Sequence, residues 1–302
     1  MHWFIVALGA PLVWSLINHC DKLILSRYFK GGGSGALMVF VAVIALPLSI
    51  GIWIFNPNVL DISLTDALVL IASGLLYNLG VLLYLKVLEY EETSLAIPFW
   101  QLTPVFAYIF GVIFLHEYLA PDKLLGAIIV ILGAVLLTVK IGGEKIIFHK
   151  KTAILMTLSS AILALGYVFF KDSEGGAFWD SMFWNQVGMF IFGAACYLVP
   201  SYRREFVDAL KQNSFGVLVL NIAEQLLEVV GIFINNYALL LAPAALVMLV
   251  EYTAQPLFVF IEGVVLTLLF PKLVEEDLSR ANILRKFVSI AIMTIGLIII
   301  VK

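Results

Sequence analysis

Residues 215–243 spell FGVLVLNIAEQLLEVVGIFINNYALLLAP, an apolar run of membrane-spanning length that still carries five polar side chains. At 3.6 residues per turn, all five fall on one face of a helix. An ionisable group near the bilayer midplane costs about 2.5–3.5 kcal/mol on insertion scales, so such groups normally face a protein interior or a water-filled cavity. We therefore expect this helix to line a polar path through a membrane. The five residues are Asn221, Glu224, Gln225, Glu228 and Asn235.

The composition places the whole chain in the membrane class. Of its 302 residues, 62% are hydrophobic and 13% are charged, and the mean hydropathy is +1.05, far above the soluble average. Apolar stretches of about 20 residues, enough to cross a hydrocarbon core about 30 Å thick, recur without a long polar region between them. We predict an all-α polytopic membrane protein with ten transmembrane helices and no soluble domain. The predicted spans are 3–20, 36–55, 66–88, 94–116, 123–140, 153–171, 178–199, 215–241, 244–270 and 286–302.

Several function classes find no support in the residue pattern. Cys20 and Cys196 are isolated thiols, which favours packing over a disulfide or a metal site. The four histidines are scattered, so no metal ligand set and no cofactor are expected. No Ser, His and acid arrangement stands out, which leaves an enzyme as the least supported class, and no nucleic-acid partner is expected. The first span begins beside Met1 without a basic leader, so we expect a retained helix.

The positions of the basic residues predict an orientation. Of eighteen Lys and Arg residues, fifteen lie at the ends of, or in the loops after, the odd-numbered predicted helices, and only Lys123, Lys171 and Lys302 lie on the other side. Positive side chains are retained in the cytoplasm. We therefore predict that both termini are extracytoplasmic. A compact chain of this kind fits the plasma (inner) membrane of a prokaryote.

The chain also repeats itself. A shift of 152 residues places Pro104 on Pro256 and Gly111 on Gly263, without gaps. Because each half would hold five helices, an odd number, the second half would enter the membrane from the opposite face. Inverted repeats of this kind are typical of secondary transporters that work by alternating access. The two predicted five-helix repeats are residues 1–151 and 152–302.

A family resemblance emerges from residues 93–119, TSLAIPFWQLTPVFAYIFGVIFLHEYL, followed by Gly126 and Gly133. This pattern resembles the EamA-type branch of the drug/metabolite transporter superfamily, over essentially the entire chain. The resemblance implies ten helices in two inverted halves, with a substrate cavity between helices 1, 3, 4, 6, 8 and 9. The proline near the middle of helix 4 and the Glu-x-Leu just after it, here Glu117 and Leu119, are the most family-like features. The second half departs from the pattern, because helix 9 lacks the corresponding Glu and about eleven extra residues precede helix 10. Members usually keep their termini in the cytoplasm, and for this chain we follow the loop charges instead.

Glu224 and Glu228 form the strongest candidate constellation. They are one helical turn apart and repel each other if both are ionised. A proton or a cationic substrate would relieve this repulsion, so the pair is a candidate proton or cation site, with proton coupling as a hypothesis. Asn221 and Gln225 share the same face. The alternative is that polar side chains such as Asn235 only form interhelical hydrogen bonds.

The predicted helix 244–270 adds a second acidic face. Glu251, Gln255 and Glu262 are spaced by four and seven residues, which places them on one side of the helix. We expect Glu251 and Gln255 to help hold the substrate. The carboxylates together favour a cationic or zwitterionic solute.

Aromatic and amide groups complete the candidate site. Trp14, Trp100 and Tyr252 are predicted to form its walls, with packing or an interfacial belt as the alternative. Lys22 and Lys171 are candidate counterions to the glutamates, although both lie close to helix ends, which favours snorkelling to the interface. The remaining candidates are Asn18 and Gln101.

Three prolines are predicted to act as hinges. A proline inside a helix removes one backbone donor and frees the carbonyl one turn earlier, which for Pro256 lies near Tyr252 and Thr253. In a membrane, such freed groups must face a cavity or a compensating side chain. The other two hinge candidates are Pro98 and Pro104.

These observations predict a secondary transporter that moves a small organic solute (a metabolite, an amine or an amino-acid-like molecule) through a midplane cavity, as a monomer or homodimer in the lipid bilayer. Two alternatives stay open. A flippase or exporter of a lipid-linked or amphipathic molecule would need a lateral opening between helices. A membrane assembly protein would show no solute flux.

Overall fold

The computed structural model describes residues 2–27, 33–90, 99–138, 150–172, 177–212, 215–269 and 280–301. Within these ranges every regular element is a helix and no strand occurs. The elements are α1 (His2–Ala7), α2 (Gly9–Arg27), α3 (Ser34–Phe55), the 3-10 helix η1 (Pro57–Leu60), α4 (Leu64–Leu88), α6 (Thr103–Phe114), α7 (Pro121–Thr138), α8 (Lys150–Asp172), α9 (Phe178–Leu198), α10 (Pro200–Gln212), α11 (Phe215–Leu241), α12 (Ala244–Leu269) and α13 (Arg280–Val301).

The helices are those of an integral membrane protein. Six of the described helices are long and apolar enough to cross a membrane, and the pair α9 and α10, bent by 95°, adds a seventh if it is counted as one span. Helix α6 and residues 287–300 of α13 are shorter apolar helices. The all-helical membrane class predicted from composition is confirmed, whereas the ten crossings stay a prediction.

Two of the predicted spans are divided. The span 3–20 contains two helices, α1 and α2. In the span 94–116, residues 99–102 hold a short helical piece and a turn before α6 begins at Thr103. Pro104 lies in the first turn of α6, where its missing N–H costs no helical hydrogen bond. The expectation that Pro104 bends a continuous helix is therefore wrong, because this proline begins a helix.

The polar interval 200–214, which lies outside the ten predicted spans, contains the helix α10. Its Phe206 and Ala209 pack against Ala36 and Phe40 of α3, and the rings of Phe40 and Phe206 lie 4.8 Å apart. Charged side chains occupy the exposed side of α10. An amphipathic helix has a low mean hydropathy, so a search for apolar runs misses it.

Two carboxylates hold the start of α3. The hydroxyl of Ser34 donates to Glu89 Oε1 at 2.6 Å, and the backbone N–H of Gly35 donates to Glu205 Oε2 at 3.0 Å. The first turn of a helix carries a partial positive charge, so both carboxylates stabilise it. The end of α4, the start of α3 and α10 therefore meet at one end of the bundle.

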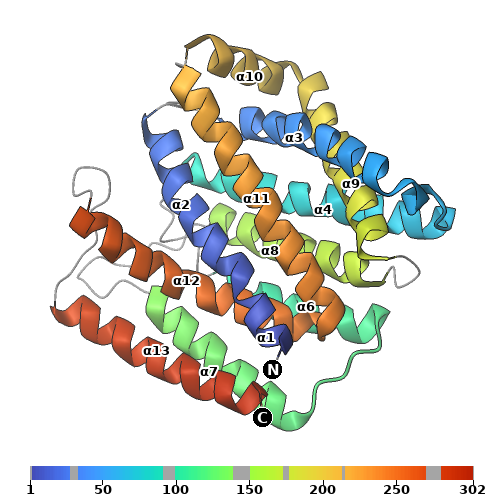
Figure 1. The fold of residues 1–302 in the computed structure, drawn as a ribbon. Helices are drawn as coiled ribbons and strands as arrows, with labels where there is room; N and C mark the ends of the chain where they lie inside the picture. Colours follow the sequence, from blue (N-terminus) through green and yellow to red (C-terminus); the bar gives the residue numbers. More distant parts are fainter. Residues whose placement is uncertain are drawn as a thin grey trace.

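Helices from the first half of the chain pack mainly against helices from the second half. Helix α4 contacts α8 and α9, and α3 contacts α9. Helix α2 contacts α11 and α12, while α6 contacts α8 and α12. Figure 1 shows α7 and α13 side by side at one edge of the bundle, and these two helices also contact each other extensively. The fold is thus a single bundle in which both halves are interleaved.

Glycines allow the closest of these approaches. A Cβ added at Gly188 of α9 would lie 2.2 Å from the carbonyl oxygen of Ile71 in α4, and one at Gly74 would lie 2.1 Å from the carbonyl oxygen of Asn185. At the α7 and α13 contact, a Cβ at Gly296 would lie 2.7 Å from the carbonyl oxygen of Gly126. Small residues of this kind let helix backbones pack closely in membranes.

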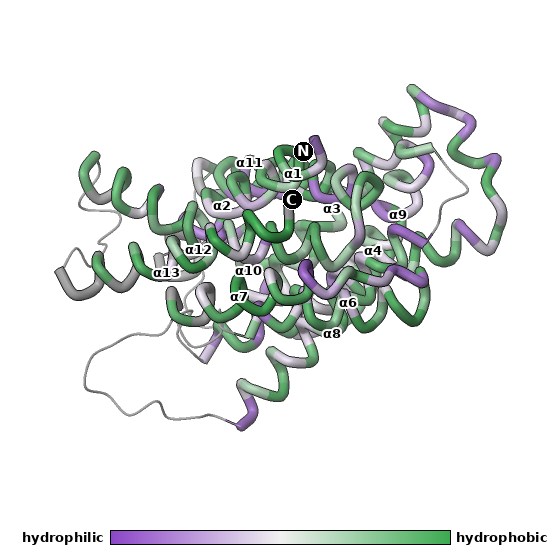
Figure 2. Tube along the Cα trace, turned by 90° about the horizontal axis from the view of Figure 1, so that it is seen from below, coloured by the Kyte–Doolittle hydropathy of each residue, from purple (hydrophilic) through white to green (hydrophobic). Residues whose placement is uncertain are grey.

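The outside of the bundle is apolar. Figure 2 shows hydrophobic residues along most of the helical trace. Leu226 and Ile298 are each 52% exposed, and Phe287 is 72% exposed. Soluble monomers rarely expose apolar surface on this scale, so the surrounding solvent is lipid.

Candidate functional site

A cavity of about 130 Å³ lies inside the bundle. Its lining comes from α2, α3, α4, α8, α9, α11 and α12 and from Trp100 before α6. At about 10–15 Å³ for each enclosed water, it has room for roughly ten water-sized groups. The family resemblance implied a cavity between predicted helices 1, 3, 4, 6, 8 and 9, which correspond to α2, α4, α6, α8, α11 and α12. The structure adds side chains from α3 and α9 to the lining.

Eight of the predicted site residues meet at this cavity. Others lie behind its surface: Gln101, Asn221 and Glu251 are each 1% exposed and do not line it. The side chains of Lys22 and Pro256 and the whole of Pro98 lie outside the described residues. The eight lining residues are Trp14, Asn18, Trp100, Glu224, Gln225, Glu228, Tyr252 and Gln255.

Helix α11 turns its polar face inward, as its periodicity predicts. Glu224 is 4% exposed and Asn235 is fully buried, whereas Leu226 and Val230 on the other face are 52% and 46% exposed. The apolar face is thus directed at lipid and the carboxylates at the interior. This amphipathic split explains why a helix with two acidic residues is stable in a membrane.

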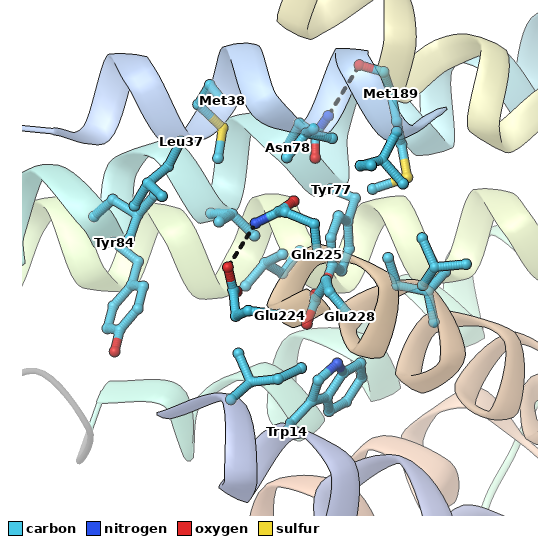
Figure 3. Close-up of a pocket in the computed structure, with 18 of the residues that line it drawn as sticks. Trp14, Leu37, Met38, Tyr77, Asn78, Tyr84, Met189, Glu224, Gln225 and Glu228 are labelled. Atoms are coloured by element: carbon cyan, nitrogen blue, oxygen red, sulfur yellow. Dashed lines mark hydrogen bonds between the residues drawn. The ribbon is translucent and has the colours of Figure 1, made fainter. Parts of the chain in front are cut away.

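Glu228 is held at the cavity by an aromatic hydroxyl. The phenol of Tyr77 in α4 donates to Glu228 Oε1 at 2.5 Å, a charge-assisted geometry. Figure 3 shows Trp14 on the other side of this carboxylate. The indole N–H of Trp14 is buried beside the same carboxylate. Glu228 therefore lies between a phenol donor and an indole donor.

The neighbouring polar groups of α11 are paired in part. Gln225 donates through Nε2 to Glu224 Oε2 at 3.1 Å, as drawn in Figure 3. Neither side-chain polar atom of Asn221 has a partner among the described residues. A buried amide without partners is unfavourable by about 1–3 kcal/mol. Glu224 and Gln225 border the cavity, whereas Asn221 lies one turn further along the same helix.

Glu251 lies in α12 and pairs with α11. With its amide oriented to donate, Asn235 Nδ2 lies 2.7 Å and 2.9 Å from the two carboxylate oxygens of Glu251. This orientation is assigned from the hydrogen-bonding partners. Glu251 therefore joins α12 to α11 behind the cavity lining.

Gln101 satisfies a carbonyl of α12. Its Nε2 donates to the backbone oxygen of Tyr252 at 3.0 Å. Residue 256, four positions later, is a proline and has no N–H to offer that oxygen. A side chain from the first half thus replaces the helical hydrogen bond that Pro256 removes, and α12 continues without a break from Ala244 to Leu269.

Glu262 has a different role from the one its helix face predicts. Ser15 of α2 donates to Glu262 Oε1 at 2.7 Å, and Glu262 is not among the residues that line the cavity. The acidic face of α12 is thus divided: Gln255 reaches the cavity, and Glu262 joins α12 to α2.

Four further lining residues escaped the sequence analysis: Tyr77, Tyr84, Tyr167 and Gln186. Tyr77 and Tyr84 are seven residues apart on α4 and share one of its faces, whereas Tyr167 and Gln186 come singly from α8 and α9. Packing between helices brings the four together at the cavity. The available signals were the spacing on α4 and the rarity of polar groups inside membrane-length runs.

A polar cluster joins the two halves at one end of the bundle. Lys171 Nζ lies 2.5 Å from Glu117 Oε1 and also donates to the backbone oxygen of Ala242. The other carboxylate oxygen of Glu117 accepts from the N–H of Ala244 at 2.9 Å, at the start of α12. The expectations that Lys171 snorkels or neutralises Glu224 and Glu228 are wrong, because Glu117 is its partner.

The cavity lies toward the opposite end. Its lining residues from α3 begin at Leu37, near the start of that helix, and those from α4 reach Leu85, near its end. That end is the one where Ser34 meets Glu89. At the end that holds Glu117 and Lys171, Asn56 donates to Asp180 at 3.3 Å. We refer to these as the Glu89 end and the Glu117 end.

Comparisons with known proteins give a family match over the first 139 residues and a shared fold. Residues 1–139 match the EamA-like transporter family. A solved structure described only as "Crystal structure of protein" resembles the chain with a TM-score of 0.68 and 15% sequence identity, over 99% of this chain and 96% of that one. At this identity the likeness shows a shared fold alone. No curated protein matches the chain.

Proposed function

Because residues 1–139 match the EamA-like transporter family, we propose that this integral membrane protein is a secondary transporter that moves a small organic solute by alternating access. The cavity bordered by Glu224 and Glu228 carries the proposal. Carboxylates inside an apolar bundle normally mark a substrate or ion pathway. The family is one of transporters, which agrees with a function other than catalysis.

The packing pairs support two equivalent moving halves, 1–151 and 152–302. Exchanging α2 with α8, α4 with α11 and α6 with α12 turns the α2 and α11 contact into the α8 and α4 contact. The same exchange turns the contact of α2 with α12 into the contact of α8 with α6. If α3 also exchanges with α9, and α7 with α13, the three remaining contacts map onto themselves: α6 with α12, α3 with α9, and α7 with α13. A pseudo-two-fold axis produces this pattern.

The directions of paired helices support the inverted arrangement. A Cβ at Gly126 would meet Ile300, and one at Gly133 would meet Met293. The later residue of α7 thus contacts the earlier residue of α13, so these two helices run antiparallel. Corresponding helices of an inverted five-helix repeat must do the same.

Loop charge assigns the cavity to one compartment. The Glu89 end carries the loops after α2 and α4, on the side where most Lys and Arg residues lie. Positive loops stay in the cytoplasm, so this side is cytoplasmic, the cavity faces the cytoplasm and both termini lie outside it. We assign the protein to the plasma membrane of a prokaryote.

Proton coupling is tested at Glu228, the carboxylate nearest to both Tyr77 and Trp14. In proteoliposomes, Glu228→Gln should retain solute counterflow, because the amide keeps the shape of the site. Proton-driven accumulation should be lost, because the amide cannot exchange a proton. Equal accumulation by both proteins would remove the proton role.

The matched control is Glu262→Gln. This glutamate is on the acidic face of α12, accepts a hydrogen bond from Ser15 and is not among the residues that line the cavity. Accumulation should persist in this variant. Loss of accumulation in both variants, with both proteins folded, would show that any carboxylate change in the bundle has the same effect.

A further inference from the structure

The cavity is lined by aromatic rings as well as by carboxylates. Tyr84 and Trp100 have ring centroids 4.2 Å apart, and Trp100 and Tyr252 have centroids 6.0 Å apart. Tyr77 and Tyr167 form a second pair at 5.9 Å. These five rings come from α4, α8, α12 and the segment before α6, and all of them line the cavity. We call them the aromatic cluster.

The charge of the lining has one sign. Glu224 and Glu228 reach the cavity, and no Lys, Arg or His occurs among its described lining residues. Figure 3 shows both carboxylates directed into the space between Trp14, Tyr77 and Tyr84. A solute placed there would meet acidic oxygens and the negative faces of rings.

The rest of the lining is mostly aliphatic, with Val41, Ile44 and Val81 among its members. Both carboxylates of the lining are on α11, and the polar groups that the other helices bring to the cavity are neutral amides and phenols, Asn18 and Gln186 among them. A methylated ammonium ion donates few hydrogen bonds or none, and its carbon surface suits aromatic and aliphatic walls. Aromatic cages bind such ions by cation–π attraction.

We propose that the solute of this transporter is a small organic cation carrying a methylated ammonium group, held by the aromatic cluster beside Glu224 and Glu228. The proposal rests on the transport function and adds the chemical class of the substrate. Trp100 occupies the central position, because it contacts both Tyr84 and Tyr252. The cavity's room for roughly ten water-sized groups suits a cation of this size.

Choline is the probe, and its uncharged isostere, in which a tert-butyl group replaces the trimethylammonium group, is the matched ligand. We expect calorimetric titration of the purified protein in nanodiscs to show saturable choline binding and at least roughly tenfold weaker binding of the isostere. Equal binding of the two molecules would overturn the proposal, because only charge distinguishes them.

The ring requirement is tested at Trp100. Trp100→Phe keeps a ring face and should hold choline affinity within about threefold, whereas Trp100→Leu should weaken it by roughly threefold to thirtyfold. Tyr118→Leu removes a ring that is 72% exposed and outside the cavity, and it should change nothing. Equal losses in Trp100→Phe and Trp100→Leu, with unchanged unfolding midpoints, would overturn the aromatic role.

The result separates the substrate class from the transport function. If choline fails to bind while another solute shows counterflow in proteoliposomes, the proposed class is wrong and transport stands. If choline binds but no solute shows flux, the cation site stands and transport falls.

Discussion

At the scale of single residues, the contact between Gln101 and the carbonyl of Tyr252 shows how the bundle tolerates a proline. Water cannot reach a freed carbonyl inside the bilayer, so a side chain must satisfy it. Gln101 does so from the other half of the chain, at 3.0 Å. The two halves are therefore joined at the point where α12 lacks its own hydrogen bond.

Replacing Gln101 by Leu should lower the free energy of unfolding by about 1–3 kcal/mol, because the carbonyl of Tyr252 would lose its partner. Thermal unfolding in detergent would measure the loss. In a Pro256→Ala background the new N–H can bond the same carbonyl, so the same substitution should be less harmful. Equal losses in the two backgrounds would contradict this assignment.

The sequence predicts the polar residues of α11 but not their partners. Periodicity alone places Glu224, Glu228 and Asn235 on one face, because a helix repeats every 3.6 residues. Nothing in the local pattern relates Glu228 to Tyr77, which lies 151 positions earlier. Likewise, Lys171 and Glu117 meet through tertiary packing. Short-range rules therefore identify a polar face, and long-range packing decides what it touches.

At the scale of helices, the contact of α4 with α9 depends on backbone proximity. Gly74 and Gly188 let the two helices approach so closely that side chains are excluded between them. In lipid, such packing replaces much of the hydrophobic driving force that operates in water.

Gly188→Ala should therefore lower the free energy of unfolding by about 1–3 kcal/mol, because its Cβ would lie 2.2 Å from the carbonyl oxygen of Ile71. Gly51→Ala is the control, since a Cβ there meets nothing within 4 Å. The control should be neutral or stabilise the protein by up to about 1 kcal/mol. Similar losses in both variants would show that helix packing does not set the effect.

Hydropathy predicts where the apolar helices lie, since each of the ten predicted segments overlaps a helix of the described chain. It misses α10, because the charged residues of this amphipathic helix lower its mean hydropathy, and it misses the turn before Thr103. Both departures share one physical reason: composition averaged over a span does not record where the backbone direction changes. The 95° bend between α9 and α10 is such a change.

At the scale of the whole molecule, the cluster of Glu117, Lys171 and the start of α12 closes one end of the bundle. It links the segment after α6 to α8 and α12, so it crosses the boundary between the proposed halves. Alternating access would require this cluster to separate when the cavity turns toward the Glu117 end.

Glu117→Gln should weaken the cluster by about 1 kcal/mol, which corresponds to a roughly fivefold shift toward the separated state. A cysteine introduced at Ala242, in a protein lacking Cys20 and Cys196, would report this shift as faster labelling by a membrane-impermeant maleimide. Asp172→Asn, at an exposed neighbour of Lys171, is the control. Unchanged labelling of the Glu117 variant would contradict a gating role.

Among the described residues, the Glu117 cluster has no counterpart at the equivalent position of the second half. The gap-free shift of 152 places Leu269, which is 66% exposed, where a second such glutamate would stand. Two end states that are closed by different contacts differ in free energy. An alternating-access protein without bound solute would therefore mostly occupy the state with the more stable closing contacts. If the Glu89 end faces the cytoplasm, as proposed, the unloaded protein would mostly expose its cavity to that compartment.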